Sequence, residues 1–437
     1  MKPNMLIFGL AYIILFGNFV ELFAGNAAFP KSGNSDVFTP RGTIAEVPGI
    51  GDGITENGQA ESIEQALQIL ITKPSDKEII AAIDLISKYP DLRAVDPLIN
   101  ILKSEPEIGS TKAHKAAQLL GQLGDRRAVQ PLIEILLNAK GKTVWKAKEY
   151  VVLLGKLGDT RAVLPLMEVL SYIADQGERF TDNGVGYDII DALAKLKDKR
   201  ALPLLIQMLR TDRPGLIEQA IAALDVFRDP AAVPGLIEIS SRPRYTMRAV
   251  MSLGHIGDPA ALDYLERLLY RYEPKKYSYF IVTAIGEIRC EQSVDILLRY
   301  YASPSMPLSN EGVTIGALID QKNIRVLKPV IKYAGINYGC RDSFQTHMID
   351  HYLRRSFSIA ELRSIIRECL RGPDKDTRLG AIALLAELGE AQDVSFLKGV
   401  AESDDTVAGA IAADSLYTLK TGEYFEVTRY YSRCRRQ

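Results

Sequence analysis

Residues 120–136 read LGQLGDRRAVQPLIEIL, and residues 154–170 read LGKLGDTRAVLPLMEVL. The offset between the two stretches is 34 residues. A fixed period of this size indicates stacked supersecondary units. A single unit of this kind cannot bury its apolar face alone, so neighbouring units must share a continuous core. The repeat therefore decides the fold.

Each copy of the repeat carries its own turn chemistry. Gly124 and Gly158 can end a helix, because glycine adopts a positive φ at low cost. The aspartate that follows, Asp125 in the first copy, can cap a second helix. Pro131 would lie early in that second helix, where a missing backbone N–H does least harm. Each unit is therefore expected to be a helix, a tight turn and a second helix.

The turn position recurs along the chain at intervals of 29 to 39 residues. It falls at Asp91, Asp125, Asp159, Asp198, Asp229 and Asp258, and in decayed form near Cys290, Gln321, Ser356 and Glu390. Apolar residues at helical spacing over 62–70 predict a helix that caps the stack. The sequence thus predicts an all-α fold, a right-handed α-α superhelix of about ten helix pairs.

The pattern Leu-Gly-x-Leu-Gly-Asp-x-Arg-Ala-Val-x-Pro-Leu, followed by Ile or Met, is carried by residues 120–133 and 154–167. It resembles the HEAT-repeat superfamily, in particular the short bacterial HEAT-like repeats first associated with phycobilisome lyases. Weaker copies lie at 196–203, 253–262 and 388–394, and the resemblance covers roughly residues 75–420. It implies a solenoid and, since superfamily members are mostly interaction scaffolds, a protein partner. Fold alone does not define a reaction.

The N-terminal region predicts export. Residues 5–20 carry no charge, and this run is short for a bilayer span of about 20 residues. Small residues follow at 24–28, as at a signal-peptide cleavage site. We expect residues 1–28 to be a signal peptide and the body to be periplasmic, or else residues 5–23 to remain as a membrane anchor. Residues 29–60, rich in Gly, Ser, Asn, Thr and Pro, are expected to be a flexible linker before a solenoid over 61–437 with a short basic tail.

The charge balance narrows the class of partner. The formal net charge is −1, so no global field would recruit nucleic acid or an anionic membrane. Contact with a membrane is expected only through an uncleaved N-terminal segment. The expected partner is another protein.

A tyrosine-rich segment is the predicted protein-binding surface. Tyrosine together with basic residues gives large contact area at low entropic cost. At helical spacing, however, such rings also serve as core residues between repeats, and this alternative stays open. The candidate residues are Tyr264, Tyr270, Tyr272, Lys275, Lys276, Tyr277 and Tyr279.

Metal and catalytic chemistry have little support in the sequence. His347 and His351 lie four residues apart, a possible spacing for metal ligands, with Asp350 or Cys340 as a further ligand. One class of HEAT-repeat enzymes binds two irons through His-Glu dipeptides, and this chain has no such dipeptide. The four cysteines show no Cys-x-x-Cys motif, and we expect mainly free, buried thiols.

These observations favour an exported, non-enzymatic protein-interaction scaffold without a cofactor. Two alternatives stay open at this stage. One is a metal-dependent or lyase-type enzyme centred on His347 and His351. The other is an assembly factor tethered to the membrane.

Overall fold

The computed structural model describes residues 56–72, 75–105, 108–139, 141, 143–176, 184–271, 277–304, 306–307, 310–338, 353–390, 392–402 and 406–421. The residues from Gln59 onward belong to one compact unit. The expected boundaries at residues 28 and 60 stay predictions, because residues 1–55 lie outside the described ranges. The first described helix, α3 (Glu56–Thr72), begins before residue 61.

Pairs of helices follow α3, and the described residues contain no strand. The first helices of eight pairs are α4 (Asp76–Lys88), α6 (Thr111–Leu123), α8 (Lys148–Leu157), α10 (Val185–Leu196), α12 (Pro214–Phe227), α14 (Thr246–Ile256), α16 (Ser278–Glu287) and α18 (Glu311–Asp320). The second helices are α5 (Val95–Ser104), α7 (Val129–Asn138), α9 (Val163–Asp175), α11 (Leu202–Met208), α13 (Val233–Ser240), α15 (Leu262–Arg271), α17 (Glu291–Tyr301) and α19 (Leu327–Tyr338).

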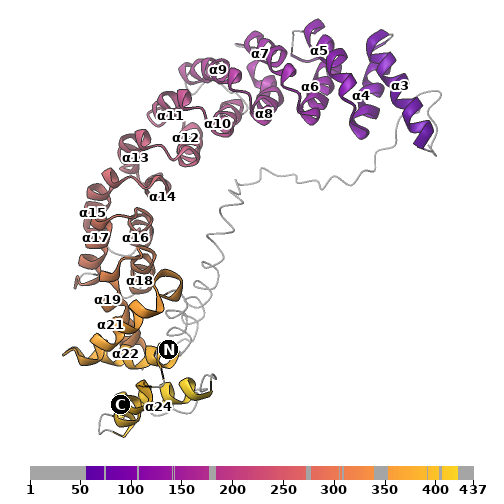
Figure 1. Ribbon diagram of the computed structural model, residues 1–437. Helices are drawn as coiled ribbons and strands as arrows, with labels where there is room; N and C mark the ends of the chain where they lie inside the picture. The colour runs from indigo at the N-terminus through magenta and orange to yellow at the C-terminus, as the bar shows by residue number, and fades with distance from the viewer. Residues whose placement is uncertain are drawn as a thin grey trace, which may run out of the picture. The chain divides into compact units, whose positions relative to one another are not determined.

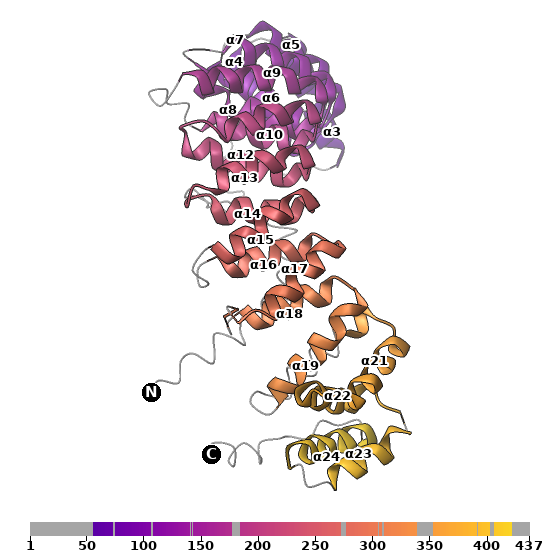
Figure 2. The same ribbon diagram turned by 90° about the vertical axis from the view of Figure 1, so that its left-hand side faces the viewer.

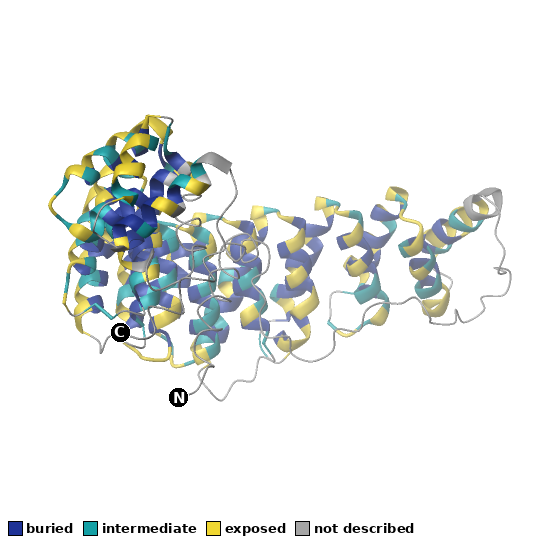
Figure 3. Ribbon diagram, turned by 90° about the horizontal axis from the view of Figure 1, so that it is seen from below, coloured by how far each residue is buried: buried dark blue, intermediate teal, exposed yellow. Residues whose placement is uncertain are grey.

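The pairs stack in chain order. Each first helix packs against the first helix of the next pair, and each second helix also packs against that next first helix. Helices α5, α7, α9, α11 and α13 accordingly form one row, and α6, α8, α10, α12 and α14 the other (Figure 1). Buried residues lie where the helices face one another, and the outer faces are exposed (Figure 3). The predicted helical solenoid is confirmed.

The turn between the two helices of a repeat has a local physical cause. Gly124, Gly158 and Gly257 end their helices at φ of 70°, 67° and 74°. The next residue, an aspartate in each case, caps a three-residue 3-10 turn before the second helix begins, rather than the α-helix directly. In the turn of Arg126–Ala128, for example, the Arg127 backbone N–H donates to Asp125 Oδ1 over 2.8 Å.

The arginine two residues after the capping aspartate links successive repeats. Arg127 donates to the Asp125 carboxylate at 2.8 Å and forms an ion pair with Asp96 of the preceding repeat, also at 2.8 Å. Arg161 similarly donates to the Arg126 carbonyl oxygen over 3.1 Å. The Asp-x-Arg pattern of the repeat therefore fixes the turn and joins it to its neighbour.

Small residues set the spacing between first helices. A Cβ placed on Gly155 would lie 2.9 Å from Ala192 Cα, and one on Gly254 would lie 2.6 Å from Ala284 Cα. Real Cβ atoms do not approach so closely, so glycine is required where these helices cross. Gly155 and Gly254 lie within their helices and are distinct from Gly158 and Gly257, which end them.

Two of the decayed turns lie two residues later than the sequence indicated. The residue that caps a 3-10 turn is Asn323, which accepts from the Arg325 N–H over 3.0 Å, whereas Gln321 only ends α18. Ser358, rather than Ser356, caps the next described helix. Both turns lie near the expected positions, and the exact register is displaced because neither copy retains the aspartate that caps the turn in the earlier repeats.

The pattern of contacts changes after α19. After a short helical stretch at residues 353–356, the remaining described helices are α21 (Ile359–Arg371), α22 (Lys375–Leu388), α23 (Asp393–Ala401) and α24 (Thr406–Thr421). Helix α22 packs on the second helix α19, as well as on α21 and α24 (Figure 2). Gly335 of α19 faces Gly380 of α22, and a Cβ on Gly380 would overlap the Ile331 carbonyl oxygen. Two backbones are therefore in direct contact here.

Candidate functional site

The tyrosine-rich segment is divided between core and surface. The Tyr264 hydroxyl lies 2.6 Å from Ser240 Oγ, and Tyr264 and Tyr277 pack against the hydrophobic core. Tyr270 is 47% exposed and meets the Tyr300 ring edge-on, with 6.0 Å between centroids. Of these tyrosines, Tyr270 is therefore the one best placed to contact a partner.

The other members of the segment add less. Tyr279 is half-buried and meets the Phe280 ring edge-on at 5.4 Å. Tyr272, Lys275 and Lys276 lie outside the described residues. A protein-binding role for the segment stays a prediction.

The two candidate metal ligands, His347 and His351, also lie outside the described residues, as does Cys340. Within the described ranges, no group of three or more His, Cys, Asp or Glu side chains is arranged to hold a metal ion. Cys290 and Cys369 are free thiols, and burial raises the pKa of Cys369.

A groove along α21 gathers charged side chains that the sequence reading did not single out. Ser358 caps this helix with a capping box: its hydroxyl accepts from the Glu361 N–H over 3.2 Å, and the Glu361 carboxylate accepts from the Ser358 N–H over 2.9 Å. Leu362, Ile366 and Cys369 are buried. The opposite part of the helix surface therefore remains available to polar residues.

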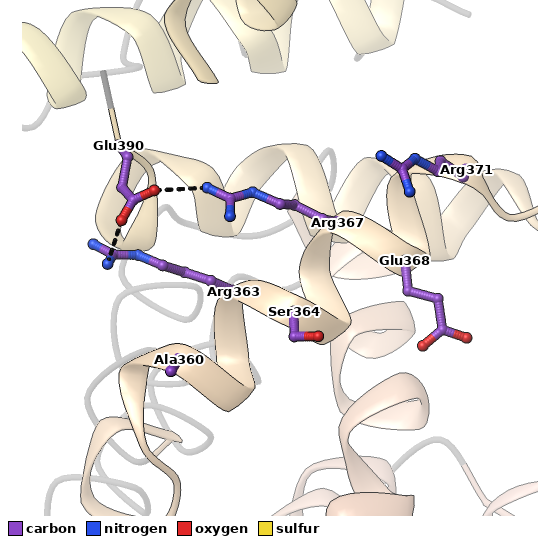
Figure 4. Close-up of a pocket in the computed structure, with 7 residues that line it drawn as sticks. All are labelled: Ala360, Arg363, Ser364, Arg367, Glu368, Arg371 and Glu390. Atoms are coloured by element: carbon purple, nitrogen blue, oxygen red, sulfur yellow. Dashed lines mark hydrogen bonds and ion pairs between the residues drawn. The ribbon is translucent and has the colours of Figure 1, made fainter. Parts of the chain in front are cut away.

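Three arginines four residues apart follow that surface: Arg363, Arg367 and Arg371. Residues at this spacing share one face of a helix. They border a groove of about 650 Å³, here called the α21 groove, which is lined by Ala360, Arg363, Ser364, Arg367, Glu368, Arg371 and Glu390 (Figure 4).

Glu390, from the loop after α22, bridges two of the arginines (Figure 4). Its Oε1 lies 2.7 Å from Arg363 and its Oε2 lies 2.9 Å from Arg367. These guanidinium groups lower the pKa of Glu390, chiefly through the hydrogen bond from Arg367. Arg367 also pairs with the buried Asp393 at 3.2 Å. The two inner arginines are thus held in place.

Arg371 differs from the other two. It is exposed in the last turn of α21, and among the described residues it has no ion-pair partner. Glu368, the acidic residue that α21 itself contributes to the groove, pairs with Lys328 at 2.7 Å. A planar guanidinium binds carboxylates well. The α21 groove can therefore bind a carboxylate-bearing ligand at Arg371.

A second charged array crosses three successive repeats. His255 Nδ1 lies 2.7 Å from Asp225 Oδ1, and His255 Nε2 lies 3.7 Å from Glu287 Oε2. The hydrogen bond to Asp225 raises the pKa of His255, although burial opposes this effect. Burial raises the pKa of Glu287. The three residues belong to α12, α14 and α16. When His255 is protonated, its contacts with Asp225 and Glu287 therefore link three successive repeats.

We expect this array to make folding more favourable at mildly acidic pH. The folded state binds a proton on His255 more tightly than the unfolded chain does. The protonated His255 makes its full contribution to the free energy of unfolding below the ordinary histidine pKa of about 6.5. This contribution is lost as the pH rises through the higher pKa of the folded state. The raised pKa of Glu287 acts in the same direction. Urea unfolding between pH 5.5 and 8.5 should show the free energy of unfolding fall with rising pH in the wild type, and fall less in His255→Gln. An equal pH dependence in the two proteins would contradict this prediction.

Comparison with known protein families finds the same kind of repeat that the sequence pattern indicates. The PBS lyase HEAT-like repeat family matches residues 112–138, 185–211 and 247–271. These segments span α6–α7, α10–α11 and α14–α15, so the resemblance inferred from the sequence is confirmed in three repeats. No curated protein matches the chain.

Solved structures with similar arrangements share little sequence with the chain. One is the complex of CpcE and CpcF of phycocyanin lyase from Nostoc sp. PCC7120, at 21% identity over 59% of this chain and 98% of that chain, with a TM-score of 0.32. Another is human deoxyhypusine hydroxylase in complex with glycerol, at 17% identity over 60% and 97%, with a TM-score of 0.25. Kap121p matches at 12% identity over 84% and 46%, with a TM-score of 0.45.

None of the described helices combines the length and the apolar character that crossing a bilayer requires. The apolar run at residues 5–20, on which the export prediction depends, lies outside the described residues.

Proposed function

We propose that the chain is an exported, non-enzymatic scaffold that binds another protein through the α21 groove. The observation that carries this proposal is the arginine row of α21, with Arg371 exposed at its end. Arginine is among the residues most often found at the energetic centre of protein interfaces. Stacked repeats also offer long surfaces for such contacts. Tyr270 is a second, separate candidate contact.

The experiment is cross-linking capture with the tagged full-length chain in its own cells, followed by mass spectrometry. One protein should be enriched with the wild type and lost with Arg371→Glu. Lys156→Glu is the matched control, because Lys156 is an exposed cation on α8, away from the groove. Tyr270→Ala tests the tyrosine surface separately. If no protein is enriched, or if Arg371→Glu changes nothing, the proposed use of the groove is wrong.

Export is supported by the uncharged run at residues 5–20 and the small residues that follow it. Fractionation and intact-mass measurement of the mature chain test this part of the proposal. Loss of about the first 28 residues supports a cleaved signal peptide. Retention of residues 5–23 in a membrane fraction supports the anchored alternative, and a full-length chain in the cytoplasm contradicts export.

A further inference from the structure

We infer that the α21 groove recognises an acidic helical segment of its partner, with carboxylates four residues apart. This inference rests on the proposed function, since it specifies the chemistry of the protein that the groove would bind.

The spacing of the arginines is the first argument. Residues four apart on a helix are separated by about 6 Å along its axis. Arg363, Arg367 and Arg371 therefore follow one another at intervals of about 6 Å along α21. The first two are paired with Glu390, and Arg371 has no ion-pair partner among the described residues. A partner helix with Glu or Asp at every fourth position has the same interval. In an extended chain, alternate side chains are about 6.6–6.8 Å apart, which gives a mismatch of about 1.2–1.6 Å over the two intervals of the row.

The second argument is the contact that already exists in the groove. The Glu390 carboxylate bridges Arg363 and Arg367 with one oxygen to each, at 2.7 Å and 2.9 Å. The site thus holds a carboxylate of the chain itself between two arginines. An arriving carboxylate would meet Arg371 first and would compete with Glu390 for Arg367.

The mixture of charges is the third argument, and it favours a protein over a polyanion. Glu368 and Glu390 line the groove, and Asp393 lies next to Arg367. Nucleic acid carries a dense, continuous negative charge, which these three carboxylates would repel. A helix with a few separate carboxylates would be repelled less than a nucleic acid, and one of these carboxylates can pair with Arg371, which has no ion-pair partner among the described residues.

The test measures binding of the full-length chain to a fluorescent alanine-based helical peptide with three glutamates four residues apart. A peptide of the same composition with the three glutamates adjacent is the ligand control. Arg371→Ala should raise the dissociation constant about fivefold. Glu390→Gln should lower it, because Arg363 and Arg367 lose their internal partner. Lys156→Ala should leave it unchanged, and thermal unfolding checks that each variant is folded.

Several results would overturn the inference. These are equal binding of the two peptides, an unchanged dissociation constant in Arg371→Ala, or preferential binding of single-stranded DNA or of vesicles containing anionic lipid. If cross-linking captures a partner through Arg371 but the spaced peptide does not bind, the proposed function stands and the acidic helix is wrong. If the peptide binds but no partner is captured, the acid-binding groove stands and the scaffold function fails.

Discussion

Gly254→Ala is expected to lower the free energy of unfolding by about 1–3 kcal/mol, the usual cost of overpacking a core. The added methyl group would lie 2.6 Å from Ala284 Cα and 2.7 Å from a Glu287 carboxylate oxygen. The first of these atoms belongs to the backbone of α16, so the helices α14 and α16 must separate. Urea unfolding followed by circular dichroism measures the change.

The same substitution elsewhere is the control. Gly316 lies on the exposed side of α18, and a Cβ there would meet nothing within 4 Å. Gly316→Ala should therefore raise the free energy of unfolding by about 1 kcal/mol, since alanine favours a helix more than glycine does. The sign of the effect must differ between the two variants. Destabilisation of similar size in both would show that the crossing at Gly254 is not the cause.

The repeat made most of this fold predictable from the sequence. Gly124 and Asp125 each have a role that depends on neighbours within three residues, so their pattern reports the turn directly. Where the capping aspartate is replaced, the sequence locates the turn only to within two residues, as at Asn323. The change in helix packing after α19 was not predictable from the sequence, because it depends on the contact of Gly335 with Gly380, 45 positions apart.

The candidate site was harder to predict, for a similar reason. The spacing of Arg363, Arg367 and Arg371 is visible in the sequence, but Glu390, which pairs with the first two, comes from the loop after α22, more than 20 residues further along the chain. The tyrosines were grouped by composition alone. Tyr264 and Tyr270 are six residues apart on α15 and so point to different faces of that helix. One accordingly packs in the core and the other is exposed.

Gly380→Val is expected to have the largest effect on the C-terminal helices, with a loss of about 3 kcal/mol or more. The Cβ would overlap the Ile331 carbonyl oxygen and would lie close to the Gly335 backbone nitrogen, at 2.8 Å. Neither atom can move without displacing α19. Since repeat stability is a sum over neighbouring interfaces, the disruption should remain local. We expect α22 to separate from α19 while the helices from α4 to α18 stay folded.

Unfolding of this variant should then show two transitions in place of one, and hydrogen exchange should be faster in α22–α24 than in α6–α14. Gly399→Ala, at an exposed site on α23 where a Cβ meets nothing within 4 Å, should keep the wild-type profile. Gly380→Val should also alter the α21 groove. Arg363, which lines the groove, donates to the Leu388 carbonyl oxygen at the end of α22 over 2.7 Å. Displacing α22 should therefore weaken binding of the spaced acidic peptide as well. Cooperative loss of all helices in one transition would show instead that the whole stack depends on this crossing.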